Sequence, residues 1–215
     1  NNLEMIIINF KNYQFGSHAV KLAKKIQKYL PNAILAVPTT EIFSIAKKTR
    51  LKIYAQNINP YKKGRATGFD LPQAVKSAGA SGSLINHSEH RISMKEIKEA
   101  VKICHSLFLK VIVCTSNLSK AKKILPLHPY AIAFEDPKLV GSGKSITKYK
   151  SKAVAKFSLM LSKTKIIPLC GAGISTAEDI KQARLLGCKG VLIASAIENV
   201  KNPLPLLKKL KEAER

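Results

Sequence analysis

Eight apolar runs of four to six residues alternate with segments of helical pattern along this chain, and this alternation constrains the fold more than any other feature. Runs that are apolar almost throughout are typical of strands buried on both faces of a sheet. Strands that alternate with helices indicate a parallel sheet with the helices outside it. The predicted strands are Met5–Phe10, Ala33–Val37, Lys52–Asn57, Ser83–Asn86, Lys110–Cys114, Ala131–Phe134, Ile166–Cys170 and Gly190–Ala194.

The segments between the strands carry apolar residues at helical spacing. Ser17 is expected to cap the first helix, and Ser93 with Glu96 has the pattern of a capping box. The stretch Ile58–Phe69 contains proline and glycine and is predicted to be a long loop. The predicted helices are Ser17–Leu30, Thr40–Lys48, Leu71–Ala78, Ser93–Leu107, Ser116–Leu125, Lys148–Leu161, Thr176–Leu186 and Pro203–Ala213.

Eight such units without a break in composition favour a closed barrel over an open sheet. An open sheet that binds a dinucleotide would be expected to carry GxGxxG after its first strand, and NFKNYQFG, residues 9–16, does not contain it. A chain of 215 residues with 46% hydrophobic residues is large enough to bury a substantial core. We therefore predict an α/β fold, a single-domain (β/α)8 barrel over residues 1–215.

The formal net charge of +24 comes from 37 basic and 13 acidic residues, and only five of the basic residues are arginines. Proteins that bind nucleic acid concentrate basic residues on one face and favour arginine. Lysines spread along the chain are more typical of solvated surfaces, so no nucleic-acid partner is expected. A positive field would attract a small anionic substrate.

No membrane partner is expected either, because no stretch approaches the roughly 18 apolar residues of a membrane span. No signal or transit peptide pattern is visible, and a cytoplasmic location is expected. The four cysteines, Cys104, Cys114, Cys170 and Cys188, lack CxxC spacing. Buried free thiols explain them better than disulfides or zinc ligands, so no metal is expected.

Polar residues gather where the predicted strands end, at the edge where barrel enzymes carry their chemistry. Asn9 and Lys11 close the first strand, His87 and Glu89 follow the fourth, and Glu135 follows the sixth. Each residue alone has an ordinary structural alternative: a solvated lysine, a packing histidine or a loop glutamate. Their common position at one edge favours a catalytic site.

Two late loops are built from small residues, Cys170-Gly171-Ala172-Gly173 after the seventh strand and Ala194-Ser195 after the eighth. Small residues let backbone N–H groups approach an anion, and barrels commonly hold phosphate at these two loops. Tight turns that serve only packing are the alternative. The pattern indicates a phosphate site.

Five segments in register resemble the triosephosphate isomerase family: NFK at 9–11, NHSEHR at 86–91, FEDPKLVGSGK at 134–144, CGAGIST at 170–176 and GVLIASA at 190–196. The resemblance runs almost end to end, and the phosphate-loop variants are similar to those of archaeal members. It implies a TIM barrel that interconverts dihydroxyacetone phosphate and D-glyceraldehyde 3-phosphate by proton transfer through an enediol(ate), in glycolysis and gluconeogenesis, without a cofactor.

The resemblance also implies a role for each polar residue. Glu135 would be the base that moves the proton, and His87 would be the electrophile at the substrate carbonyl. A helix starting at His87–Glu89 would keep that imidazole neutral through its positive end. Lys11 would add positive charge and bind substrate, Asn9 would hydrogen-bond substrate, and Glu89 would organise Lys11.

The segment 136–144 would be a lid over the substrate. The resemblance implies that Val140 and Gly141 close on the phosphate and that Gly173, Ala194 and Ser195 supply further backbone donors. The family usually has proline directly after the catalytic glutamate, where this chain has Asp136. Turned inward, Asp136 would disfavour ionisation of the base; turned outward, it would have little effect.

Family members associate with themselves through the region that corresponds to Ile58–Phe69, so a homodimer or homotetramer is expected. Two alternatives remain. Another phosphate-binding barrel, such as a relative of indole-glycerol-phosphate or thiamine-phosphate synthase, would share the late loops without the combination of Asn9, Lys11, His87 and Glu135. A nucleic-acid-binding protein on an inactive barrel would account for the charge.

Overall fold

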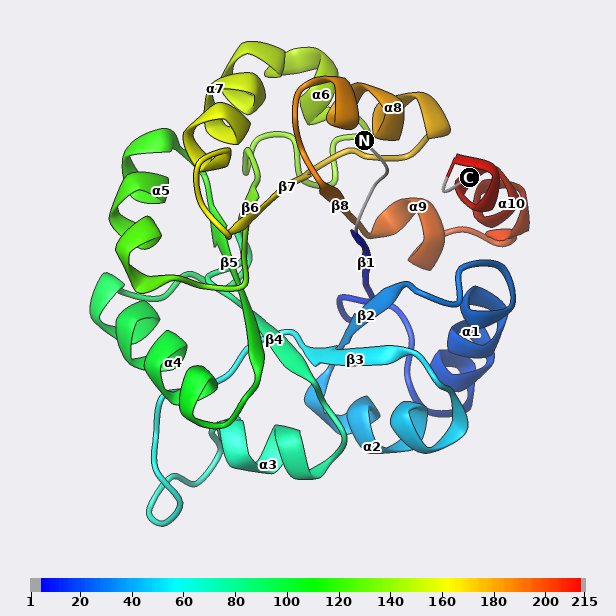
Figure 1. Ribbon diagram of the computed structural model, residues 1–215. Coiled ribbons are helices and arrows are strands. Elements are labelled where there is room, and N and C mark those ends of the chain that lie inside the picture. The colour runs from blue at the N-terminus through cyan, green and yellow to red at the C-terminus, as the bar shows by residue number, and fades with distance from the viewer. Residues whose placement is uncertain (1–4, 214–215) are drawn as a thin grey trace.

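Eight parallel strands form a closed barrel in the order β1-β2-β3-β4-β5-β6-β7-β8, and the helices surround it (Figure 1). The computed structural model describes residues 5–213; the predicted domain also includes residues 1–4, 214 and 215, which lie outside the described part. The strands are β1 (Met5–Asn9), β2 (Ile34–Val37), β3 (Lys52–Ala55), β4 (Gly82–Ile85), β5 (Lys110–Thr115), β6 (Ala131–Phe134), β7 (Ile167–Gly171) and β8 (Gly190–Ile193). The predicted (β/α)8 architecture is confirmed.

Helices connect successive strands on the outside of the barrel (Figure 1). They are α1 (Gly16–Tyr29), α2 (Thr39–Lys48), α3 (Pro72–Ser77), α4 (Met94–Ser106), α5 (Leu118–Ile124), α6 (Ile146–Tyr149), α7 (Ser151–Leu161), α8 (Ala177–Leu185), α9 (Ser195–Glu198) and α10 (Leu204–Ala213), with a 3-10 turn η1 (Leu125–Leu127). Among residues 5–213, no helix is long and apolar enough to cross a membrane.

The strands separate two apolar layers, which explains why they are apolar almost throughout. On β1, Ile7 lies in a cluster with barrel-interior residues such as Leu84 and Leu192. Its neighbours Ile6 and Ile8 belong to the larger cluster between the strands and the helices. Because side chains alternate along a strand, both sets must be apolar in a barrel covered by helices.

Helix ends depend on contacts that the local sequence does not reveal. Ser17 does not cap α1; Phe15 occupies the N-cap position without a side-chain hydrogen bond. The backbone N–H of Gly16 donates instead to Glu41 Oε2 of α2 at 2.8 Å. The predicted capping box at Ser93 and Glu96 is confirmed. Because a distant carboxylate satisfies the start of α1, the prediction of a serine cap is wrong.

The helix predicted at Lys148–Leu161 is divided. It forms α6 and α7, which meet at Lys150 with φ −133° and ψ 28°. The short helix α9 was not predicted. The predicted long loop after β3 is present and projects from the barrel before α3 (Figure 1). Its two ends are joined by hydrogen bonds from Asn59 N to Asp70 O at 2.8 Å and from Asp70 N to Asn59 Oδ1 at 2.9 Å.

Candidate active site

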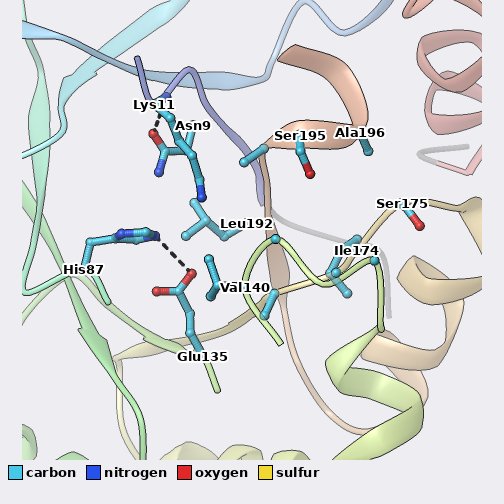
Figure 2. A pocket seen from close by; sticks show the side chains of 15 residues that line it. Asn9, Lys11, His87, Glu135, Val140, Ile174, Ser175, Leu192, Ser195 and Ala196 are labelled. Carbon is cyan, nitrogen blue, oxygen red and sulfur yellow. Dashed lines mark hydrogen bonds and ion pairs between the residues drawn. The ribbon is translucent and has the colours of Figure 1, made fainter. Parts of the chain in front are cut away.

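A pocket of about 150 Å³ lies at the carboxyl ends of the strands (Figure 2). The structure brings together in it every residue predicted to act on or bind substrate: Asn9, Lys11, His87, Glu135, Val140, Gly141, Gly173, Ala194 and Ser195. Other residues that line the pocket were not predicted to bind substrate, among them Gly143 of the predicted lid, Ile174 and the barrel residue Leu192. Figure 2 shows the side chains of Lys11, His87 and Glu135 converging.

Glu135 directly follows β6, and its backbone N–H donates to Thr115 O at 2.9 Å. Its side chain is 3% exposed. Oε2 has no hydrogen-bond partner among the described residues, whereas Oε1 lies 3.4 Å from His87 Nε2. A Cβ at position 171 would come within 3.0 Å of Oε1, so Gly171 leaves room for the carboxylate. Glu135 is therefore a buried carboxylate with one oxygen available.

The ring of His87 is buried, and its two nitrogens have different surroundings. Nδ1 accepts a hydrogen bond from the backbone N–H of Glu89 at 3.2 Å. A neutral imidazole that accepts at one nitrogen carries its proton on the other. The contacts therefore assign the N–H of the neutral ring to Nε2, the nitrogen that faces Glu135 and the pocket (Figure 2).

The predicted helix start at His87 is wrong. His90 N donates to His87 O at 2.9 Å in a turn, and the next helix, α4, begins only at Met94. The described residues 87–93 therefore contain no helix start that would oppose protonation of the ring. Burial lowers the pKa of His87, but the hydrogen bond and charge of Glu135 and the charge of Glu89 raise it above its ordinary value.

Lys11 follows β1 in a left-handed conformation, with φ 44°. Its Nζ lies 2.6 Å from Glu89 Oε1, which is the contact that the predicted organising role of Glu89 requires. Asn9 Oδ1 accepts from Lys11 N at 2.9 Å and from Gln56 Nε2 at 3.1 Å. Gln56 also donates to Lys11 O at 2.8 Å. These contacts use the Asn9 oxygen and leave its amide N–H groups to face the pocket.

The site depends on Gln56, which sequence reasoning missed. The prediction placed this residue inside a strand ending at Asn57, whereas β3 ends at Ala55. Gln56 therefore occupies the same strand-end position as the other polar residues of the site. The search for polar residues at strand ends, which identified Asn9 and His87, would also have identified Gln56 if the strand had been predicted to end at Ala55.

The two late loops meet beside the lid segment, residues 136–144. Ala172 and Gly173 have left-handed φ values of 74° and 67°. A Cβ on Gly173 would lie 2.0 Å from Lys144 O, so glycine allows the end of the lid segment to pack against this loop. On the other side, α9 begins at Ser195; Ile197 N and Glu198 N donate to Ala194 O at 2.9 Å and 3.1 Å, so the N–H groups of Ser195 and Ala196 are the ones that the start of this helix presents. Such groups suit an anion.

Carboxylate, imidazole and ammonium groups in one pocket suit proton transfer next to an anion. They do not form a metal site, since the described residues contain no group of three or more histidine, cysteine or acidic side chains that could hold an ion. All four cysteines are buried free thiols. Cys114 lies near the base, and burial followed by the charge of Glu135 raises the pKa of this thiol.

Comparisons with known proteins identify relatives of this chain. Residues 4–210 match the family model described as triosephosphate isomerase. A triosephosphate isomerase from Saccharolobus solfataricus is 40% identical over 206 residues, with 93% of this chain and 91% of the relative covered. One from Methanobrevibacter smithii is 37% identical, with 94% and 95% covered.

The solved structures give the same fold. The crystal structure of triosephosphate isomerase from Bartonella henselae superposes with a TM-score of 0.77 and covers 98% of this chain and 99% of its own. Its sequence identity is 18%, so this match bears on the fold alone. The family model and the archaeal relatives decide the family: the chain belongs to the triosephosphate isomerases.

Proposed function

We propose that this chain interconverts dihydroxyacetone phosphate and D-glyceraldehyde 3-phosphate by moving a proton between adjacent carbons through an enediol(ate). The observation that carries this is the convergence of Glu135, His87 and Lys11 in one pocket beside two phosphate-type loops. Family membership supports the same reaction. The activity belongs to glycolysis and gluconeogenesis.

In the proposed reaction, Glu135 takes the proton from the carbon next to the carbonyl group and returns it to the neighbouring carbon. His87 donates a hydrogen bond from Nε2 to the carbonyl oxygen and stabilises the negative charge that develops there. The proton of the neighbouring hydroxyl group then moves through the imidazole to this oxygen, so that the carbonyl and hydroxyl groups exchange places. Glu135 Oε1 and His87 Nε2 lie 3.4 Å apart in the structure. When substrate binds, each of the two groups would contact the substrate in place of the other. Lys11 adds a fixed positive charge, held by Glu89 at 2.6 Å.

The phosphate group would lie between the late loops and the lid segment. Gly173, Ala194 and Ser195 line one side of the pocket, and Val140 and Gly141 line the other. Backbone N–H groups from both sides would hold the dianion. Closing the lid segment would exclude water from the enediol(ate), which protects it from side reactions.

Substitution of the base tests this function. Glu135→Gln should lower kcat by about 10²–10⁴-fold, the typical contribution of a positioned base, without changing the far-UV circular dichroism spectrum. A coupled assay of glyceraldehyde 3-phosphate isomerisation measures it, with Glu99→Gln, an exposed carboxylate on α4, as the control. A folded parent without turnover, or a Glu135→Gln variant of nearly parental activity, would contradict the assignment.

We also propose that the chain associates with itself through the loop of residues 58–69. Tyr61 and Phe69 are 44% and 48% exposed there, and their ring centroids lie 4.5 Å apart. A second pocket, of about 660 Å³, opens beside the active site and includes Tyr13, Phe15 and Glu89 among its lining residues. An aromatic loop and a pocket of this size suit mutual insertion by two copies.

The proposed location of this activity is the cytoplasm, where its triose phosphate substrates would be made and consumed. Cell fractionation with an antibody against the chain would test it. Recovery of the protein in another compartment would contradict it.

A further inference from the structure

The residue after the proposed base is a second carboxylate, Asp136, and it holds the start of the lid segment together. Its Oδ1 accepts a hydrogen bond from Lys138 N at 2.9 Å, and its carbonyl oxygen accepts one from Leu139 N at 2.9 Å. Its Oδ2 lies 3.4 Å from Lys150 Nζ. One side chain therefore fixes a turn in the lid segment and also joins that turn to a residue beyond it.

Lys150 is well placed to act as an anchor because it lies at the junction of α6 and α7. Its N–H donates to Ile146 O at 2.9 Å, and its carbonyl oxygen accepts from Ala153 N at 2.9 Å and Val154 N at 3.0 Å. Its backbone is thus fixed to both helices. The other end of the lid segment contacts the same region, since Lys144 Nζ lies 5.6 Å from the ring centroid of Tyr149.

The carboxylate of Asp136 lies outside the active pocket. Asp136 and Lys150 both line a groove outside the barrel, between α5 and α7, and neither lines the active pocket. Further along the lid segment, Leu139 is buried in the core and Val140 lines the active pocket. Any effect of this ion pair on the reaction must therefore act through the position of the lid segment and of Glu135.

We propose that Asp136 and Lys150 are a positioning pair that holds the lid segment and the adjoining base in place for substrate. The proposal rests on the proposed function, because it assumes that Glu135 and the lid segment act on triose phosphate. Asp136 is joined to Glu135 by one peptide bond, so motion at Asp136 is transmitted directly to the base.

The pair is suited to a segment that moves during turnover. The side chain of Asp136 is 18% exposed and that of Lys150 is 51% exposed, so water screens the ion pair. Pairs of this kind are weak, and their loss changes an equilibrium by a factor of about five at most. The pair can therefore favour one lid position without preventing the lid segment from opening.

Three substitutions separate the turn from the ion pair. Asp136→Asn keeps an oxygen that can accept from Lys138 N but removes the charge, whereas Asp136→Ala removes both interactions. Lys150→Met removes the ammonium and keeps an unbranched apolar side chain. Lys152→Met is the matched control, because this exposed lysine on α7 contributes the same charge, and among the described residues the ion pair of Asp136 is made by Lys150 and not by Lys152.

Steady-state kinetics gives the first readout. Asp136→Asn and Lys150→Met should each lower kcat/KM by about two- to fivefold, mainly through KM, because the reacting groups themselves remain. The double variant should be no worse than either single variant, since both remove one interaction. The decrease in kcat/KM should be larger for Asp136→Ala. Lys150→Arg and Lys152→Met should both keep the kcat/KM of the parent.

Hydrogen exchange of the peptide covering residues 136–144 gives a readout independent of activity. Exchange should be faster in Asp136→Asn and Lys150→Met than in the parent and in Lys152→Met, and exchange of β5 and β6 should not change. Unchanged exchange and kinetics in both variants, or additive effects in the double variant, would overturn the proposal. A parent without isomerase activity would overturn the proposed function, while the exchange comparison would still decide whether the pair holds the segment.

Discussion

Glu198, the last residue of α9, is a carboxyl group buried without a partner. The residue is 2% exposed, and neither carboxyl oxygen has a hydrogen-bond partner among the described residues. The basic residues that line the nearest pocket, His18, Lys21, Lys25 and Lys201, form no ion pair with it in the described part of the chain. Burial raises the pKa of Glu198 to about 9, so the group stays protonated at neutral pH.

This group should make stability fall as the pH rises. A carboxyl group whose pKa is raised by folding contributes its full stability below its ordinary pKa of 4.5, and the contribution is lost progressively up to about pH 9. Glu198→Gln should therefore match the parent near pH 4.5 and exceed it at neutral pH by about 3 kcal/mol. Urea denaturation from about pH 4.5 to pH 9 measures the difference. Parallel stability curves for the parent and the variant would show that Glu198 is not the cause.

The site residues that follow directly after strands could be predicted from the sequence. Asn9, Lys11, His87 and Glu135 all follow apolar runs, and parallel strands in a barrel bring their carboxyl ends to one edge. The surroundings of Glu198 could not be predicted, because its burial depends on helices from both ends of the chain. The turn at His87 was also missed, since the N–H that reaches Nδ1 comes from folded geometry.

At the scale of elements, the contact between the lid segment and the loop after β7 depends on Gly173. A Cβ there would lie 2.0 Å from Lys144 O and 2.8 Å from Ser145 N, and both atoms are backbone. The backbone must shift to relieve such a contact. Ile146 N donates to Ala172 O at 3.1 Å in the same place, so a shift would also weaken the anchor of α6.

Gly173→Ala should therefore loosen phosphate binding and the end of the lid segment together. We expect KM to rise at least tenfold and the free energy of unfolding to fall by about 2 kcal/mol, the combined cost of a left-handed alanine and a clash. Gly16→Ala is the matched control, because Gly16 has φ +53° and nothing within 4 Å of an added Cβ. Equal losses in the two variants would attribute the effect to the backbone angle alone.

Helices and strands were predicted correctly where the apolar pattern and the length of a segment both indicated the same kind of element. The strand Ala131–Phe134 was predicted with its observed bounds because apolar residues fill it and a polar residue follows. The four residues of α9 are too few to show helical periodicity. The break at Lys150 has no glycine or proline to mark it, so it could not be read from the sequence.

At the scale of the whole molecule, the proposed self-association should depend on the exposed aromatic residues of the loop 58–69. The parent should sediment as a multiple of 23.6 kDa. Tyr61→Glu with Phe69→Glu should shift the mass toward the monomer, because burying unpaired carboxylates at an interface is costly. Tyr61→Phe keeps the ring and should leave the mass unchanged. A parent that sediments at 23.6 kDa would refute the proposal.

The closure of the barrel also determines when the active site exists. Asn9 and Lys11 lie near the start of the chain, whereas Ala194 and Ser195 follow the last strand. They meet only after β1 pairs with β8, with Ile6 opposite Val191. A chain still emerging from the ribosome therefore holds its base and its electrophile without a place for the phosphate. Catalysis must wait until β8 has been made and has paired with β1.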